Sequence, residues 1–191
     1  MVRALFGLAG EDNAFGRRLL FLLVLASLPV AVVGYLARDS IETAFSSPFV
    51  PGIMLLVTGF ILWFADRQMA AGELAHMSAK QALWMGIGQS LALLPGLSRS
   101  GTTLAVGMFA GLERREAARF SFLMAVPAVF GATLLETVNL LQDAEAALAV
   151  NIPLVGAGAL ASLVTSYAAI RFFLAFLRRG RLRWFAWYVW S

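Results

Sequence analysis

A group of polar residues interrupts one of the most apolar parts of the chain, at residues 95–103, PGLSRSGTT. Arg99 carries a permanent positive charge on a planar fork that matches two oxygens of a phosphate group. Gly96 and Gly101 permit backbone angles that turn amide N–H groups toward a ligand. Hydroxyl groups that can cap a helix or donate to an oxygen anion come from Ser98, Ser100, Thr102 and Thr103. Together these residue types predict a binding site for an oxygen anion at low dielectric.

Two further observations extend this predicted site. Pro95 is expected to end the helical piece before the cluster, and the next helix is expected to begin near Thr102. The N-terminal amides and the dipole of that second helix would also favour negative charge. Gln89, one to two helical turns before Pro95, adds an uncharged amide to the same pocket.

The small and hydroxylated residues have a second interpretation, because Ser and Gly also let membrane helices pack closely. In that case Arg99 would stretch its side chain to the membrane surface. An arginine between two apolar helical pieces costs roughly 2.5 kcal/mol or more unless it lines a wet or paired site. We therefore favour anion binding for the cluster as a whole.

The composition indicates the environment of these residues. The chain has 191 residues, of which 60% are hydrophobic and only 14% are charged, and its mean hydropathy is +0.80. Several apolar runs approach or exceed the ~20 residues that cross a bilayer, so we predict an all-α polytopic membrane protein. The pI of about 10.3 does not indicate a nucleic-acid partner, because the basic residues cluster at the ends of apolar runs.

About four transmembrane helices are predicted from apolar runs at residues 19–37, 50–65, 120–141 and 152–177. Two shorter runs, residues 81–94 and 103–112, flank the polar cluster, and at 1.5 Å per residue neither comfortably crosses ~30 Å of hydrocarbon. We expect them to form a re-entrant or broken helix pair that carries PGLSRSGTT at its tip. The last residues, WFAWYVWS, are too short to span, and residues 1–191 are predicted to form a single membrane domain.

The basic residues predict the orientation, because loops rich in Lys and Arg stay in the cytoplasm. With a cytoplasmic N-terminus, Arg38 falls outside, beside Asp39 and Glu42. A further outer loop contains Asp143 and Glu145. The cytoplasmic side then holds Arg3, Arg17, Arg18, Arg67, Lys80, Arg114, Arg115, Arg119, Arg178, Arg179, Arg181 and Arg183. This distribution requires the short pair to enter and leave on the cytoplasmic side, with its polar tip toward the outer half of the membrane.

The sequence predicts no metal site. No arrangement of His, Asp and Glu has metal-ligand spacing, and the chain contains no cysteine. His76, the only histidine, lies in a polar loop assigned to the cytoplasm, where a solvated role is favoured.

LPGLSRSGTT, with upstream GIGQSLALLPG and downstream RFSFLMAVPAVFGA, closely resembles the undecaprenyl-diphosphatase family of bacitracin-resistance membrane phosphatases. The similarity covers nearly the whole chain, from about Arg17 to Tyr188. It implies hydrolysis of undecaprenyl diphosphate to undecaprenyl phosphate in the bacterial inner (plasma) membrane, which recycles the lipid carrier for peptidoglycan synthesis and confers bacitracin resistance. It also implies an all-helical fold with re-entrant helices, an inverted duplication and a site that opens toward the outer face.

The resemblance implies roles for the residues of the cluster. Arg99 would bind the diphosphate, and Arg99 and Ser98 would be the catalytic residues. The substrate-binding set would be Gln89, Pro95, Gly96, Ser100, Gly101, Thr102 and Thr103. The implied partners are a polyprenyl diphosphate lipid and the bilayer, and a homo-oligomer is left open. A divalent cation, Mg²⁺ or Ca²⁺, is implied by the resemblance alone, since the chain shows no evident ligands for it.

The chain departs from the family pattern in two places. The family carries an earlier motif of the type EGxTEFLPVSSTGH, which does not occur here, and it continues into a last helix where this chain stops. Val189 stands where the family usually has arginine after the tyrosine. We therefore expect a chain that is truncated relative to the family at both ends and does not hydrolyse the lipid alone. Two alternatives stay open: a polyprenyl-phosphate transporter or flippase, and a non-catalytic membrane remnant.

Overall fold

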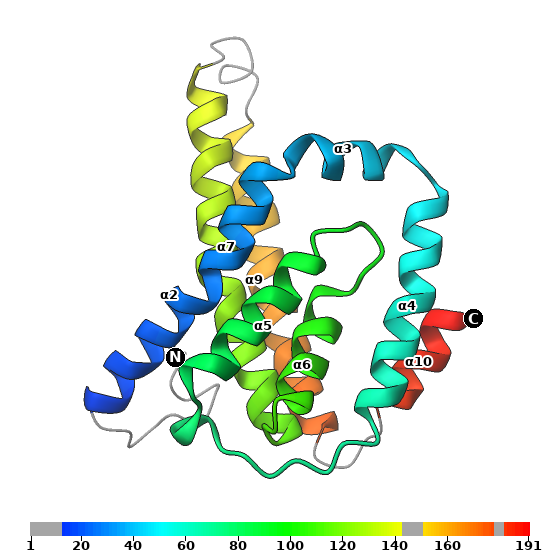
Figure 1. Cartoon of the computed structure of the whole chain (residues 1–191). Helices are drawn as coiled ribbons and strands as arrows, with labels where there is room; N and C mark the ends of the chain where they lie inside the picture. Colours follow the sequence, from blue (N-terminus) through cyan, green and yellow to red (C-terminus); the bar gives the residue numbers. More distant parts are fainter. Residues whose placement is uncertain (1–12, 143–150, 178–181) are drawn as a thin grey trace.

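The computed structural model describes residues 13–142, 151–177 and 182–191, and the elements within them are helices (Figure 1). In chain order these are α2 (Asn13–Leu36), α3 (Arg38–Ser46), α4 (Phe49–Ala65), the 3₁₀ helix η1 (Leu74–His76), α5 (Ala79–Leu91), α6 (Arg99–Phe109), α7 (Arg114–Gln142), α9 (Ile152–Phe176) and α10 (Arg183–Trp190). This arrangement confirms the predicted all-α polytopic membrane fold.

Three of the described helices, α2, α7 and α9, are long and apolar enough to cross a membrane. The helix α4 has 17 residues, which is close to the shortest length that spans ~30 Å of hydrocarbon. It follows α3 at a bend of 99°. If the bent pair of α3 and α4 is counted as one span, the described residues hold four candidate spans, against the about four that the apolar runs predict.

The two short helices form the predicted pair that carries the polar cluster. The helix α5 has 13 residues and α6 has 11, so each rises less than about 20 Å along its axis. They contact each other, and both have their far ends at the end of the molecule where α2 and α7 begin (Figure 1). The connection between them, residues 92–98, is therefore the tip of a hairpin that turns back inside the helical body.

The predicted limits of the two short helices are wrong by a few residues. The helix α5 ends at Leu91 rather than at Pro95, and three-residue turns follow, with the Leu94 N–H donating to the Leu91 carbonyl at 3.2 Å. The helix α6 begins at Arg99 rather than near Thr102, because Ser98 caps it and accepts the Gly101 N–H at 3.2 Å. Five of the predicted site residues, Arg99 and residues 100–103, therefore lie in the first turns of α6.

The buried core surrounds the short pair. It contains Leu22 and Ala26 of α2, Met85 of α5, Leu104 of α6 and Phe120 of α7. These residues hold α5 and α6 between α2 and α7. By contrast, most side chains of α9 and of the second half of α7 are exposed, as is expected of helices that face lipid.

Most of the described basic residues gather at one end of the molecule, where α2, α5 and α7 begin and where α4 ends (Figure 1), whereas Arg38 and Arg99 lie elsewhere, at the starts of α3 and α6. Arg18 donates to the carbonyls of Ala75 and Met77 at 2.8 and 2.9 Å. Asp66 accepts from Arg114 at 2.9 Å and from the Leu182 N–H at 2.7 Å. The first two bonds join the start of α2 to the loop before α5, and the other two join the end of α4 to the starts of α7 and α10. Arg3, Arg178, Arg179, Arg181, Asp143 and Glu145 lie outside the described residues.

Candidate functional site

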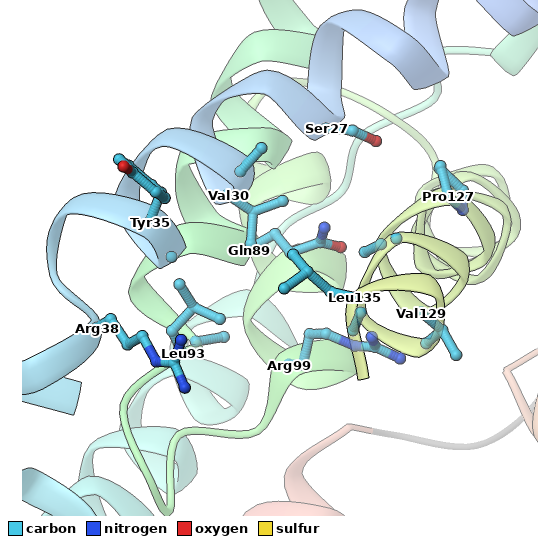
Figure 2. Close-up of a pocket in the computed structure, with 16 residues that line it drawn as sticks. Ser27, Val30, Tyr35, Arg38, Gln89, Leu93, Arg99, Pro127, Val129 and Leu135 are labelled. Carbon is cyan, nitrogen blue, oxygen red and sulfur yellow. The ribbon is translucent and has the colours of Figure 1, made fainter. Parts of the chain in front are cut away.

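A cavity of about 650 Å³ lies between α2, the end of α5, the start of α6 and the middle of α7 (Figure 2). Its walls are mainly apolar, and Val30, Leu93, Val129 and Leu135 are among the residues that form them. The polar residues that line it are Ser27, Tyr35, Arg38, Gln89 and Arg99. A cavity of this composition suits a ligand with a charged head and an apolar body.

Arg99 is the first residue of α6, and its side chain extends from there toward α7 (Figure 2). Its guanidinium makes no hydrogen bond or ion pair with any residue that the structure describes. A charge next to apolar walls is expensive unless water or a counter-ion meets it. The guanidinium is therefore available to an anion in the cavity.

Gln89 brings a second polar group into the cavity from α5. Its side chain is 1% exposed, and neither its amide nitrogen nor its amide oxygen has a partner among the described residues. Figure 2 shows this amide between α2 and α7, and Gln89 is one of the residues that line the cavity. A buried amide without partners costs about 1–3 kcal/mol, which a ligand that hydrogen-bonds to it would recover.

The predicted site residues of the connection hold the tip in place instead of lining the cavity. Gly96 adopts φ = 89°, and a Cβ there would overlap the backbone of Pro51. The Ser98 N–H donates to the Thr58 hydroxyl at 3.0 Å, and that hydroxyl lies 3.3 Å from the Gly96 carbonyl. Pro95 is buried. Thr58 thus ties the tip to α4, and no motif in the sequence indicates this role.

The remaining predicted residues belong to the first turns of α6. Gly101, Thr102 and Thr103 are buried, whereas Ser100 is exposed. The Thr103 hydroxyl donates to the Arg99 carbonyl at 2.8 Å and also contacts the Ser121 hydroxyl of α7. The Thr102 hydroxyl has no partner within the described ranges. Of the nine predicted residues, the structure brings Gln89 and Arg99 together in the cavity and places the other seven around them.

Arg38, at the start of α3, also lines the cavity. Its Nε donates to Glu42 at 2.8 Å. From its place in the sequence, Arg38 is predicted to lie in an outer loop, apart from the site. One feature of the sequence could have indicated this role. The charge distribution places Arg38 on the outer side of the membrane, and the tip between the two short helices is predicted to point toward the same side.

A family model of the bacitracin resistance protein BacA matches residues 1–191. The chain belongs to this family. Among individual proteins, it is 39% identical over 177 residues to an undecaprenyl-diphosphatase of Methanobrevibacter smithii, covering 91% of this chain and 62% of that protein. It is 36% identical over 174 residues to one of Carboxydothermus hydrogenoformans, covering 91% and 67%. It is 41% identical over 175 residues to one of Syntrophotalea carbinolica, covering 91% and 65%.

Membership of the BacA family confirms the resemblance on which the roles of the cluster rest. The chain spans between 62% and 67% of the length of these three relatives. Arg99 and Gln89, which line the cavity, both belong to the stretch that carries the resemblance.

The described residues of this BacA family member do not fit the divalent cation that the resemblance implies. The cavity is lined by two arginines and by no carboxylate within the described ranges. Those ranges also contain no group of three or more His, Cys, Asp or Glu that could hold a metal ion. Mg²⁺ and Ca²⁺ bind mainly to carboxylate and carbonyl oxygens, and the positive guanidinium groups would repel them. The cation therefore stays a prediction from the resemblance.

Proposed function

We propose that this chain binds the diphosphate headgroup of undecaprenyl diphosphate in the cavity and takes part in its hydrolysis to undecaprenyl phosphate. The observation that carries the proposal is the combination of Arg99 and Gln89. In the described part of the chain, the guanidinium and the amide both lack protein partners, and both belong to residues that line one apolar cavity between membrane helices. The similar proteins that bear the name undecaprenyl-diphosphatase support the choice of ligand.

The proposed site would act by neutralising and positioning charge. The Arg99 fork can hold two oxygens of one phosphoryl group, and the Gln89 amide can donate to another oxygen. Phosphoryl transfer depends mainly on such positioning and charge stabilisation. The apolar walls, with Val30 and Leu135, would receive the first part of the lipid chain. Ser98 stays a prediction as a catalytic residue, since its hydroxyl caps α6 in this structure.

We also propose that the protein lies in the plasma membrane with its N-terminus in the cytoplasm. The gathering of described basic residues at one end of the helices supports this orientation. The tip between α5 and α6 would then point toward the outer face. The lipid would enter the cavity with its headgroup toward the tip.

The proposal is tested by binding and by phosphate release. With the chain in nanodiscs, farnesyl diphosphate serves as a short-chain probe, and its Kd is measured by calorimetry. Arg99→Ala should weaken binding by about tenfold or more, because a charge-assisted contact is lost. Arg17→Ala, which removes an exposed arginine at the other end of α2, is the control and should leave the Kd unchanged. Equal Kd values for Arg99→Ala and the wild type would rule out the proposed headgroup site.

Phosphate release from undecaprenyl diphosphate separates the enzymatic role from the alternatives. Release that Arg99→Ala abolishes would establish a phosphatase. Binding without release would agree with the expectation that the chain alone does not hydrolyse the lipid. In that case, movement of the lipid between the two leaflets would distinguish a transporter from a remnant that only binds.

A further inference from the structure

The cavity contains a second guanidinium, that of Arg38, which comes from a different element than Arg99. Arg38 begins α3, directly after α2; it is one of the residues that line the cavity, and its side chain ends beside Leu93 (Figure 2). Arg99 enters from the start of α6, on the other side of Leu93. Two cations from two separate elements therefore line one apolar cavity.

Only one of the nitrogens of the Arg38 guanidinium is used in a hydrogen bond among the described residues. Glu42 takes only its Nε, and the two terminal nitrogens have no partner among the residues that the structure describes. Both side chains are largely exposed, at 67% for Arg38 and 64% for Glu42. Exposed ion pairs at this helical spacing contribute little stability, so the pair does not hold Arg38 firmly against a stronger anion. The terminal nitrogens can therefore meet a ligand while Nε stays on Glu42.

The number of cations matches the number of phosphoryl groups in the proposed ligand. One guanidinium fork holds the oxygens of one phosphoryl group. A diphosphate has two such groups, whereas the monophosphate product has one. Resting on the proposed function, we propose that Arg38 is a specificity-determining residue: it binds the second phosphoryl group and so makes the cavity prefer the lipid diphosphate to the lipid monophosphate.

This assignment gives the two arginines different roles. Arg99, beside the Gln89 amide, would contact any phosphorylated lipid in the cavity, and Arg38 would contact only one that carries two phosphoryl groups. After hydrolysis the Arg38 contact is lost, which favours release of the monophosphate. Discrimination by a group that is satisfied by one ligand and not by the other is a general source of specificity.

The test compares two probes, farnesyl diphosphate and farnesyl monophosphate, with the full chain in nanodiscs. Arg38→Gln should weaken diphosphate binding by about tenfold and change monophosphate binding by less than about twofold. Arg99→Gln should weaken the binding of both probes. Glu42→Gln is the matched control, because it breaks the same ion pair but keeps the guanidinium. It should leave diphosphate binding unchanged or tighter.

Three outcomes would overturn the inference. If Arg38→Gln alters neither probe, or both equally, Arg38 does not read the second phosphoryl group. If Glu42→Gln weakens diphosphate binding as much as Arg38→Gln, the ion pair acts through the shape of α3 and not through contact with the ligand. If the wild type binds neither probe, both this inference and the proposed function fail. If the wild type binds both probes and only Arg99→Gln loses that binding, the proposed function stands.

Discussion

Gly96 shows how a single residue sets the position of the tip. It adopts φ = 89°, and its Cα lies so close to α4 that an added Cβ would overlap the backbone of Pro51. Gly111 has a similar φ of 96°, but open space surrounds it. The two glycines thus separate the cost of the backbone angle from the cost of close approach.

We predict that Gly96→Ala destabilises the protein clearly more than Gly111→Ala. Both substitutions force alanine into the left-handed region, at a cost of about 1–2 kcal/mol. Gly96→Ala must also displace the tip from α4, so it should weaken farnesyl diphosphate binding, which Gly111→Ala leaves unchanged. Thermal unfolding in detergent and the Kd measure the two effects. Equal losses for the two variants would show that the contact with Pro51 does not matter.

Single residues also show what the sequence can predict of the site. Arg99 and Gln89 are conspicuous because a charge and an amide stand in an apolar stretch of the chain. Thr58 carries no such signal, since its role depends on Ser98, which is 40 residues away in sequence. Arg38 has an ordinary surface interpretation beside Glu42, and only the arrangement of α2, α5 and α7 brings it to the cavity.

At the scale of helices, the crossing of α5 over α2 forms one side of the cavity. An added Cβ at Gly86 would overlap the Ala26 carbonyl and would lie 3.0 Å from the Ala26 Cα. The helices therefore approach as closely as their backbones allow. This contact places Ser27 of α2 and Gln89 of α5 on the same cavity.

We predict that Gly86→Ala pushes α5 away from α2 and destabilises the protein by about 1–3 kcal/mol, the usual cost of overpacking. Gly16→Ala, in α2, is the control, because nothing lies within 4 Å of its added Cβ. That control should be neutral or more stable by about 0.5–1 kcal/mol, since alanine favours helix. Thermal unfolding measures both changes. If Gly86→Ala is as stable as the control, α2 and α5 are not packed too closely at Gly86 to accept a Cβ, and this prediction is wrong.

The helices themselves are largely predictable, but some of their starts are not. Apolar runs predict the C-terminal end of each described span to within one residue, but α2 and α7 begin six residues earlier than their apolar runs, in polar turns that precede the lipid-facing part. The start of α6 differs, because a run of Ser and Gly suggests irregular backbone while the Ser98 cap makes the same run helical. The position of α10 against α4 rests on ring contacts of Trp190 with Phe60 and Trp63, which no local pattern indicates.

For the whole molecule, composition alone predicts an all-helical membrane protein, and the structure confirms it. What composition cannot supply is the bend of 99° between α3 and α4, or the presence of Arg38 in the lining of the cavity. The orientation in the membrane rests on charge. The described basic residues at the end where α2 begins predict that this end faces the cytoplasm.

This orientation is measurable because the chain contains no cysteine, so each introduced thiol is the only one in the molecule. Ser40 is exposed on α3, and Met69 is 100% exposed in the loop between α4 and α5. In intact cells, a membrane-impermeant maleimide should label Ser40→Cys at once and Met69→Cys only after the membrane is permeabilised. The opposite pattern would place the cavity tip toward the cytoplasm. The lipid diphosphate would then have to approach from the inner leaflet, and the charge argument for the outer-facing site would be wrong.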